Sequence, residues 1–385
     1  SLRTVYPELD GVGYQQVLPA AEVVPDLTPV PVAEEDLFAE AAAVVGVGFD
    51  VTVEVPFRVR LFAVSESEHV LVLVVHHIAA DGFSMGPLTR DLVTAYASRV
   101  AGEAPAWAPL EVQYADFAIW QREVLGSEDD PQSLISAQVG FWTKTLAGVP
   151  EQLDLPADRP RPRVMSHRGA SHRFTIDPGL RSAVTDLAHR TSATEFMVVH
   201  AALSVLLARL SGTEDIAIGT PVAGRGEAAL DDLVGMFVNT LVLRTQVDAG
   251  ESFEGLLSRV RGADLEAFGH ADVPFERLVE ILDPERSQAR HPLFQVMLAF
   301  QNLGQSALEL PGLTVSGVDV DTVTAKFDLS WTFVEGSGGA YLVDLNYATD
   351  LFDEDTVVSF AERFVRVLEA VTSEPSAVVG DIEIL

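Results

Sequence analysis

A short, strongly apolar run stands out in the hydrophobic pattern of the first half of the chain. Residues 70–75 are all Val or Leu, and the run ends at His76 and His77. A β-branched run of this length predicts a buried strand, because the helices of a protein core are longer. Residues 57–64 alternate arginine with apolar side chains, and a polar turn at residues 65–68 separates them from the run. The two segments therefore form a predicted β-hairpin.

Helical and strand-like patterns then interleave to the end of the chain. The expected helices cover residues 88–100, 114–121, 138–146, 178–191, 194–210, 253–268, 275–282 and 353–371. The expected strands cover residues 171–176, 215–225 (strand, then loop), 237–247, 293–301, 327–334 and 340–347. The helix at 194–210 is apolar on all sides and is expected to be buried, with Gly212 closing it, and Asp353 is an expected N-cap. Because hairpins exclude an all-parallel sheet, we expect an α/β or α+β fold with mixed sheets.

The length of 385 residues exceeds what one compact core usually organises. Residues 154–163 are rich in proline and arginine and have no periodicity, which is typical of a linker. We therefore expect two subdomains, at residues 1–158 and 159–385. The chain opens at Ser1 without a start methionine or a capping signal, so we expect the natural protein to extend upstream.

Composition narrows the possible functions. The absence of cysteine excludes disulfides, a thiolate nucleophile and a thiolate metal site. With 25 basic and 57 acidic residues, the net charge of −32 argues against nucleic acid and anionic membranes as partners. There is no signal peptide and no apolar run approaching about 20 residues, so a cytoplasmic protein is expected.

The end of the apolar run carries the candidate chemistry: His76, His77, Asp81 and Gly82 lie within seven residues. If strand geometry continues to His77, the two imidazoles point to opposite faces and only one can face a cavity. A metal site is disfavoured by that divergence and by the absence of zincin spacing. A purely structural strand end and an acid/base centre remain as alternatives, the second because neutral imidazole accepts a proton near pH 7.

A protein nucleophile for such a base is hard to find. Ser84 lacks a Gly-x-Ser-x-Gly elbow, so the nucleophile is expected to belong to a substrate, which indicates group transfer between two bound molecules. Residues 219–226 lack both the P-loop and the dinucleotide-binding pattern. His200, inside the apolar helix, is expected to be a core residue, and His270 to precede a helix start.

Taken together, these segments resemble the condensation domain of nonribosomal peptide synthetases, within the chloramphenicol acetyltransferase-like superfamily. Residues 76–82 match the His-His-x-x-x-Asp-Gly motif. Further matches follow in order at residues 1–4, 114–121, 234–240 with Arg244, 270–276 and 286–293. The ordered matches cover nearly the whole chain.

The resemblance implies two chloramphenicol acetyltransferase-like subdomains forming a V-shaped pseudo-dimer around a tunnel. It implies an acyltransferase of antibiotic and secondary metabolite biosynthesis. Donor and acceptor peptidyl carrier protein domains deliver phosphopantetheine thioesters, and the acceptor amine attacks the donor thioester in peptide bond formation. An adjacent adenylation domain is implied, and no cofactor or metal bound by the domain itself.

The family pattern also assigns residues. It makes His77 the catalytic histidine, acting either as a base or by positioning the amine and stabilising the tetrahedral species. On physical grounds Gly82 is expected to offer its amide to the developing oxyanion. Asp81 holds the loop by pairing with an arginine, for which Arg3 is the candidate, and His76 packs. Asn239 and Ser84 are expected on the substrate side.

This sequence departs from the family in two respects. The sequence begins inside the family's upstream motif, so we expect the family's first strand and helix to lie upstream of Ser1, and Phe83 stands where tryptophan is usual. The remaining motifs are closest to the type that accepts an L-configured donor. A free-standing coenzyme A-dependent acyltransferase and a non-catalytic, condensation-like recruitment domain remain as alternatives.

Overall fold

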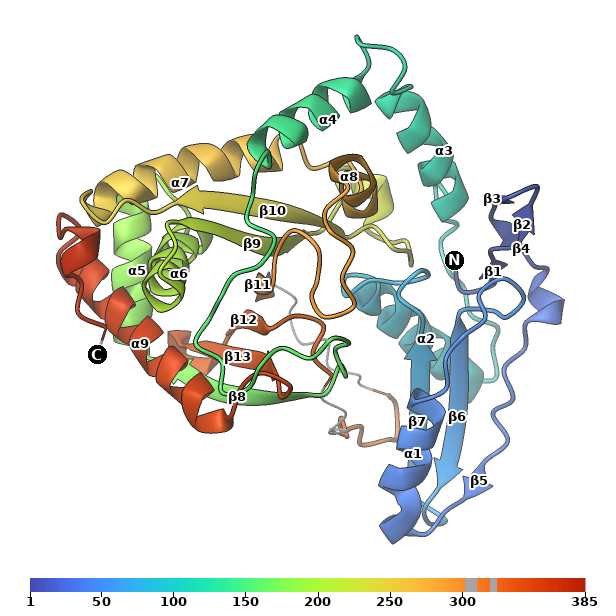
Figure 1. Ribbon diagram of the computed structural model, residues 1–385. Coiled ribbons are helices and arrows are strands. Elements are labelled where there is room, and N and C mark those ends of the chain that lie inside the picture. Colours follow the sequence, from blue (N-terminus) through green and yellow to red (C-terminus); the bar gives the residue numbers. More distant parts are fainter. Residues whose placement is uncertain (302–309, 319–323, 385) are drawn as a thin grey trace. The chain divides into compact units, whose positions relative to one another are not determined.

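The computed structural model describes residues 1–301, 310–318 and 324–384 and divides into two compact units (Figure 1). The described part of the first unit comprises residues 1–124, 223–238 and 310–318; that of the second comprises 125–222, 239–301 and 324–384. The boundary predicted between residues 158 and 159 lies inside the second unit. Because residues 223–238 return to the first unit, the units are not two consecutive halves of the chain.

The first unit is built on a small sheet in the order β5-β6-β7. Its main elements are β5 (Val30–Pro31), α1 (Leu37–Val45), β6 (Phe57–Ala63), β7 (His69–Val75), α2 (Met85–Val100) and α3 (Tyr114–Leu125), whose last residue reaches the second unit. Four two-residue strands near the start form two short antiparallel pairs: β1 (Thr4–Val5) with β4 (Gln16–Val17), and β2 (Glu8–Leu9) with β3 (Val12–Gly13).

The predicted hairpin is confirmed, but its second strand is not buried. β6 pairs antiparallel with β7, from Phe57 opposite Val75 to Ala63 opposite His69. Among the described residues, β7 pairs with β6 and with no other strand, and its side chains alternate between half-buried and largely exposed, with Leu71 47% exposed. The prediction of a buried strand is therefore wrong, because β7 is the edge strand of the sheet that the described residues of this unit form.

The second unit contains a six-stranded mixed sheet in the order β10-β9-β11-β12-β13-β8. The strands are β8 (Gly169–Ile176), β9 (Asp215–Val222), β10 (Asn239–Gln246), β11 (Val296–Gln301), β12 (Leu329–Glu335) and β13 (Tyr341–Ala348). β11 runs parallel to both β9 and β12, whereas the other neighbouring pairs are antiparallel. The expected mixed α/β class is confirmed, including the β12–β13 hairpin.

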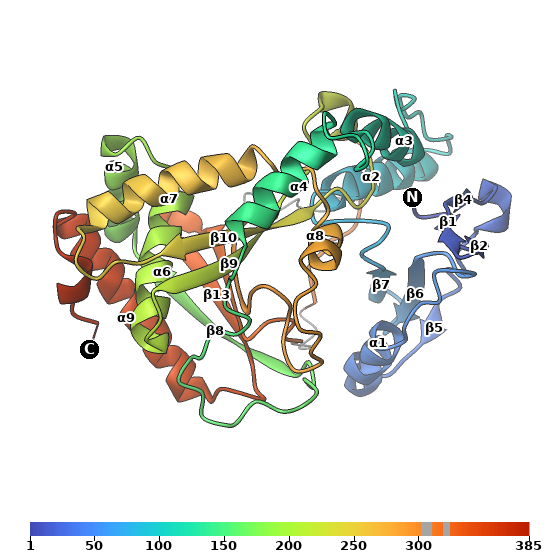
Figure 2. The same ribbon diagram turned by 45° about the horizontal axis from the view of Figure 1, so that its top comes forward.

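Helices α5, α6, α7 and α9 gather on one face of this sheet (Figures 1 and 2). The helices of this unit are α4 (Leu134–Thr145), α5 (Pro178–Arg190), α6 (Glu195–Ser211), α7 (Phe253–Phe268), α8 (Phe275–Leu282) and α9 (Glu354–Ser373). α6 is buried along most of its length, and Gly212 closes it with φ +71°, both as predicted. Asp353 precedes α9 as expected, but its carboxylate pairs with Arg159 and does not cap the helix.

The membrane-span criterion of length and hydropathy is met by no single helix in the described part of the chain; α5 and α6 meet it only as a pair bent by 105°.

The proline-rich segment 154–163 has no helix or strand, yet it is bound tightly to the second unit. Arg161 forms two hydrogen bonds to the Asp328 carboxylate, which is almost completely buried. Asp158 accepts hydrogen bonds from the backbone of Asp353 and from the hydroxyl of Thr356. The segment is a strap fixed at several points, rather than the flexible linker that its composition indicates.

Candidate active site

The two histidines follow β7 without sharing its geometry. β7 ends at Val75, and His77 lies in a turn, so the alternation argument for opposite faces does not apply. His76 is half-buried: its backbone N–H donates to Pro56, its Nδ1 accepts a hydrogen bond from the N–H of Ile78 (3.0 Å), and its ring meets the ring of Phe49 edge-on. His76 thus packs on Phe49 and bonds to its own turn, and its supporting role in the site stays a prediction.

The His77 side chain is exposed, and no hydrogen bond to its imidazole occurs within the described residues. Both ring nitrogens are therefore open to a substrate. Gly82, also exposed, has an N–H without an acceptor in the same part of the chain, while its carbonyl accepts from Met85. Gly82 does not have a positive φ, so no unusual backbone torsion requires a glycine at this position. What distinguishes Gly82 is a backbone N–H that no side chain of its own covers.

Asp81, in contrast, is fully engaged. Its Oδ1 accepts hydrogen bonds from the backbone N–H of Ser84 (2.8 Å) and from the Arg225 guanidinium (3.1 Å), and its Oδ2 accepts from the N–H of Phe237 (3.0 Å). The Asp81 side chain is 0% exposed and that of Arg225 is 5% exposed. Both oxygens of this carboxylate are hydrogen-bonded, and the side chain is closed to solvent, so Asp81 ties residues 81–84 to Arg225 and Phe237.

The arginine partner of Asp81 is therefore Arg225 and not Arg3. Arg3 is exposed, and its guanidinium donates to the carbonyl of Leu18. Sequence reasoning noticed residues 219–226 only as a loop that does not bind phosphate. The sequence did contain an indication of this partner, because Arg225 is the single arginine of a glycine-rich segment that follows a predicted strand.

Ser84 also differs from expectation. Its side chain is 0% exposed, and its hydroxyl contacts Asp81, Arg225 and Gly235. With no surface open to a ligand, Ser84 supports the turn from inside, so its predicted place on the substrate side is corrected.

The loop at residues 233–237 supplies the remaining partners of this hydrogen-bond network, through the backbones of Gly235 and Phe237. The hydroxyl of Tyr114, at the start of α3, donates to the carbonyl of Met236 (2.7 Å), and burial raises the pKa of Tyr114 to about 12. Phe237 packs against Tyr114 and lies under the Arg225 guanidinium at 4.1 Å. A Cβ on Gly235 would lie 2.3 Å from the Tyr114 ring, so only glycine fits there. Three of the matched motifs thus meet around one turn of the first unit.

Asn239 belongs to the second unit, where it organises a loop. Its Nδ2 donates to the carbonyls of Ala271 (2.8 Å) and Val273 (2.7 Å), and its Oδ1 accepts from the N–H groups of Thr240 and Phe275. Both amide donors and the amide oxygen are occupied, so Asn239 holds the start of α8. The Asn239 side chain therefore has no free polar group with which to bind a substrate, as its predicted substrate-side role would require.

Two side chains of α4 that were not predicted as site residues form hydrogen bonds to the same loop, at His270 and Asp272. Gln138, 2% exposed, exchanges two hydrogen bonds with Asp272, and Trp142 donates to the carbonyl of His270. The His270 ring stacks on Phe141 at 3.9 Å, as a structural histidine would. The indication was present in α4 itself, because a glutamine on its apolar face needs a buried partner.

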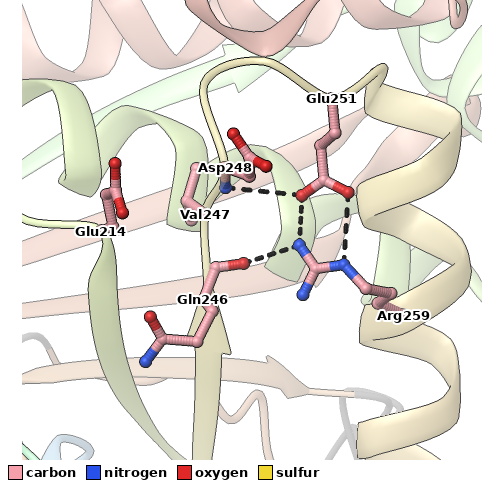
Figure 3. Close-up of a pocket in the computed structure, with 6 residues that line it drawn as sticks. All are labelled: Glu214, Gln246, Val247, Asp248, Glu251 and Arg259. Carbon is pink, nitrogen blue, oxygen red and sulfur yellow. Dashed lines mark hydrogen bonds and ion pairs between the residues drawn. The ribbon is translucent and has the colours of Figure 1, made fainter.

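A surface depression of the second unit, of about 250 Å³, offers no competing site. It is lined by Glu214, Gln246, Val247, Asp248, Glu251 and Arg259 (Figure 3). Arg259 already donates to the Gln246 carbonyl (2.7 Å) and to the Glu251 carboxylate. Across the described ranges, no group of three or more His, Cys, Asp or Glu side chains is placed to hold a metal ion.

Comparisons with known proteins agree with the motif pattern. The family model described as Condensation domain matches residues 1–385. A dimodular nonribosomal peptide synthase of Bacillus subtilis (strain 168) is 47% identical over 391 residues, covering 100% of this chain and 16% of that protein. The chain therefore spans about a sixth of this curated relative.

Two solved structures extend the comparison to the fold. A complex of the X-domain and OxyB from teicoplanin biosynthesis is similar at 38% identity and a TM-score of 0.89, covering 100% of this chain and 84% of that one. The first condensation domain of the calcium-dependent antibiotic synthetase, bound to a substrate analogue, has a TM-score of 0.71 at 20% identity over 100% and 87% of the chains, which supports the fold alone. The chain therefore belongs to the condensation domain family, as a condensation domain of nonribosomal peptide synthetases.

Proposed function

We propose that this domain forms an amide bond between a donor acyl or peptidyl thioester and the amine of an acceptor aminoacyl thioester, both presented on the phosphopantetheine of carrier protein domains. One observation carries the proposal: an exposed, unpaired His77 and a free Gly82 amide share a turn that the buried Asp81–Arg225 pair holds in place. An unpaired imidazole beside a free amide suits acyl transfer to a nucleophile that a substrate supplies.

The residues can be given roles in the reaction. The acceptor amine attacks the donor carbonyl, which forms the N–C bond. His77 orients the amine and accepts its proton, and the Gly82 N–H donates to the oxygen on which negative charge develops. The C–S bond then breaks, and the proton passes to the departing thiolate. The product is longer by one residue and stays on the acceptor carrier.

Neither a cysteine nor the serine nearest the motif can act as a competing nucleophile. The chain contains no cysteine, and Ser84 is buried and hydrogen-bonded within the protein. Asp81 acts by holding the turn, and His76 by packing beneath it. The domain itself holds no cofactor in this scheme, because the phosphopantetheine arrives on its partners. The size of the synthase that it resembles favours carrier and adenylation domains as neighbours in one polypeptide.

The test is an amide-formation assay with loaded donor and acceptor carriers, comparing wild type with His77→Ala. His69, an exposed histidine at the start of β7, supplies the matched control His69→Ala. We expect product with wild type and the control, and loss of product with His77→Ala. Full activity of a folded His77→Ala variant would falsify the catalytic assignment. An arm with coenzyme A thioesters and no carriers tests the alternative of a free-standing acyltransferase.

A second candidate function is non-catalytic recruitment of a partner enzyme. It is favoured by the 38% identity to an X-domain whose structure was solved in complex with OxyB. If wild type makes no amide with any loaded carrier pair, yet binds a biosynthetic enzyme in a His77-independent manner, recruitment replaces condensation as the conclusion.

A further inference from the structure

Ser84 occupies the N-cap position of α2 but does not cap the helix. An N-cap serine normally has β-region torsions and accepts a hydrogen bond from the second or third N–H of the helix. Ser133 at α4 and Ser252 at α7 both do so. Ser84 has helical torsions, φ −64° and ψ −21°, and its side chain makes no cap hydrogen bond. Its hydroxyl is therefore committed to something else.

That commitment saturates the hydroxyl group. A serine hydroxyl has one hydrogen and two lone pairs. The lone pairs of Ser84 face three donors: the Arg225 guanidinium (3.0 Å), the N–H of Gly235 (3.0 Å) and, at the longer distance of 3.3 Å, the N–H of Asp81. Its hydrogen can be donated to either of two acceptors at 2.8 Å, the Asp81 carboxylate or the Gly235 carbonyl. The Gly235 carbonyl also accepts a hydrogen bond from the backbone N–H of Asp81. One oxygen atom thus contacts the Asp81 carboxylate, the Arg225 guanidinium and both backbone groups of Gly235.

The cluster has little freedom to shift in response. Gly235 cannot move towards α3, because the Tyr114 ring occupies the place of the missing side chain. The Asp81 side chain is 0% exposed, so water cannot easily replace a lost partner. The Ser84 hydroxyl bonds to both backbone groups of Gly235 and to the Asp81 carboxylate, and no other group in the described part of the chain does so.

We propose that Ser84 is a positioning residue, whose hydroxyl joins the turn carrying His77 and Gly82 to the loop at Gly235. This inference rests on the proposed function and adds a residue to its machinery. Ser84 touches no reacting atom; it acts by fixing residues 81 and 82. Loss of the hydroxyl loosens the turn, and the Gly82 amide and the His77 imidazole lose their alignment.

The experiment compares Ser84→Ala, Ser84→Gly and Ser204→Ala with wild type in the two-carrier assay, well below the unfolding temperature. Ser204 is the matched control, because it is also 0% exposed and its hydroxyl has no partner. We expect both Ser84 variants to lower kcat between about 10- and 100-fold, with KM for the acceptor carrier within about 2-fold of wild type. Ser204→Ala is expected to behave as wild type.

Three results would overturn the inference. The first is a wild-type kcat for Ser84→Ala. The second is retention of kcat by Ser84→Gly alone, since glycine is an adequate N-cap and that pattern would indicate simple capping. The third is a change confined to KM, which would indicate substrate contact. If Ser84→Ala does not fold, Ser84→Cys, similar in size with weaker hydrogen bonding, is assayed with the same expectation.

Hydrogen–deuterium exchange separates this inference from the proposed function. Residues 77–84 are expected to exchange faster in Ser84→Ala than in wild type or Ser204→Ala, whether or not amide forms. Faster exchange with no amide from wild type would refute condensation but keep the positioning role. Normal amide formation by wild type with unchanged exchange and unchanged kcat in Ser84→Ala would refute the positioning role alone.

Discussion

The Arg225 guanidinium lies 3.1 Å from the Asp81 carboxylate, and the two residues are 144 positions apart in the chain. Both side chains are almost completely buried, so the pair is shielded from solvent screening. A buried charge that loses its partner is strongly destabilising, and the two single substitutions should therefore differ from their combination.

We expect Arg225→Ala to lower the free energy of unfolding by about 3–5 kcal/mol, because it leaves the Asp81 carboxylate buried without its cation. Asp81→Ala should lower both stability and turnover. The double variant should lose less unfolding free energy than the sum of the losses in the two single variants. Urea unfolding of all four proteins in a double-mutant cycle measures this difference. An unchanged melting temperature with lost activity in Asp81→Ala would instead indicate a direct chemical role for this carboxylate.

His77→Ala should leave the fold intact, because the imidazole is exposed and makes no hydrogen bond or ion pair with the described residues. The loss of a positioned base or orienting group is expected to lower kcat by about 100- to 10,000-fold. Steady-state amide formation gives kcat, and circular dichroism confirms the fold. The assignment fails if kcat changes by less than the His69→Ala control does.

Arg161→Ala tests whether the strap at residues 154–163 is structural. Burial raises the pKa of Asp328, and Arg161 opposes that rise. Removing the arginine should lower the free energy of unfolding by about 3 kcal/mol, measured by urea titration. Arg163 is the matched control, because it lies on the same strap, is exposed and makes no hydrogen bond or ion pair with the described residues. Arg163→Ala should therefore change the free energy of unfolding by less than about 0.5 kcal/mol. Equal effects of the two substitutions would show that the pair does not fasten the strap.

Asn239→Asp tests the clamp on the loop before α8. The substitution keeps the shape of the side chain but turns two donors, facing the Ala271 and Val273 carbonyls, into an acceptor. We expect a loss of about 1–3 kcal/mol from unmade hydrogen bonds, read from thermal or urea unfolding. A wild-type stability with altered KM would favour the substrate-side role predicted from the sequence.

His291 should make stability depend on pH. Burial among aromatic side chains lowers its pKa below the ordinary value of about 6.5, opposed by hydrogen bonding to the backbone of Pro292 and Phe294. Because the folded pKa is depressed, the unfolded chain binds more protons below pH 6.5. The contribution of neutral His291 is therefore present above pH 6.5 and is lost as pH falls towards the folded pKa.

The corresponding measurement is the urea midpoint between pH 5 and 7 for wild type and His291→Phe. The variant should show the smaller decrease on acidification, because it has no imidazole to protonate. Identical pH profiles for the two proteins would mean that His291 does not contribute to the acid sensitivity.

Local pattern was sufficient for most elements of the fold. The β6–β7 and β12–β13 hairpins, the buried helix α6 and its closure at Gly212 follow from periodicity and turn chemistry, which operate over a few residues. Several predicted strand starts are displaced by one to three residues, the start of β11 by the most. The strand predicted from residue 293 begins at Val296, because Leu293 has φ +66° in a tight turn closed by the N–H of Phe294 and the carbonyl of Pro292.

The ordered motifs, the candidate histidine and the absence of a cysteine nucleophile could all be recognised in the linear sequence. The folded chain was needed to show that Arg225 is the partner of Asp81, that Ser84 is buried beneath the turn, and that the Asn239 amide group is hydrogen-bonded to a loop. The physical reason is distance along the chain: Asp81 and Ser84 meet Arg225 and Gly235 across more than 140 residues, and no periodicity encodes which buried donor will meet which acceptor.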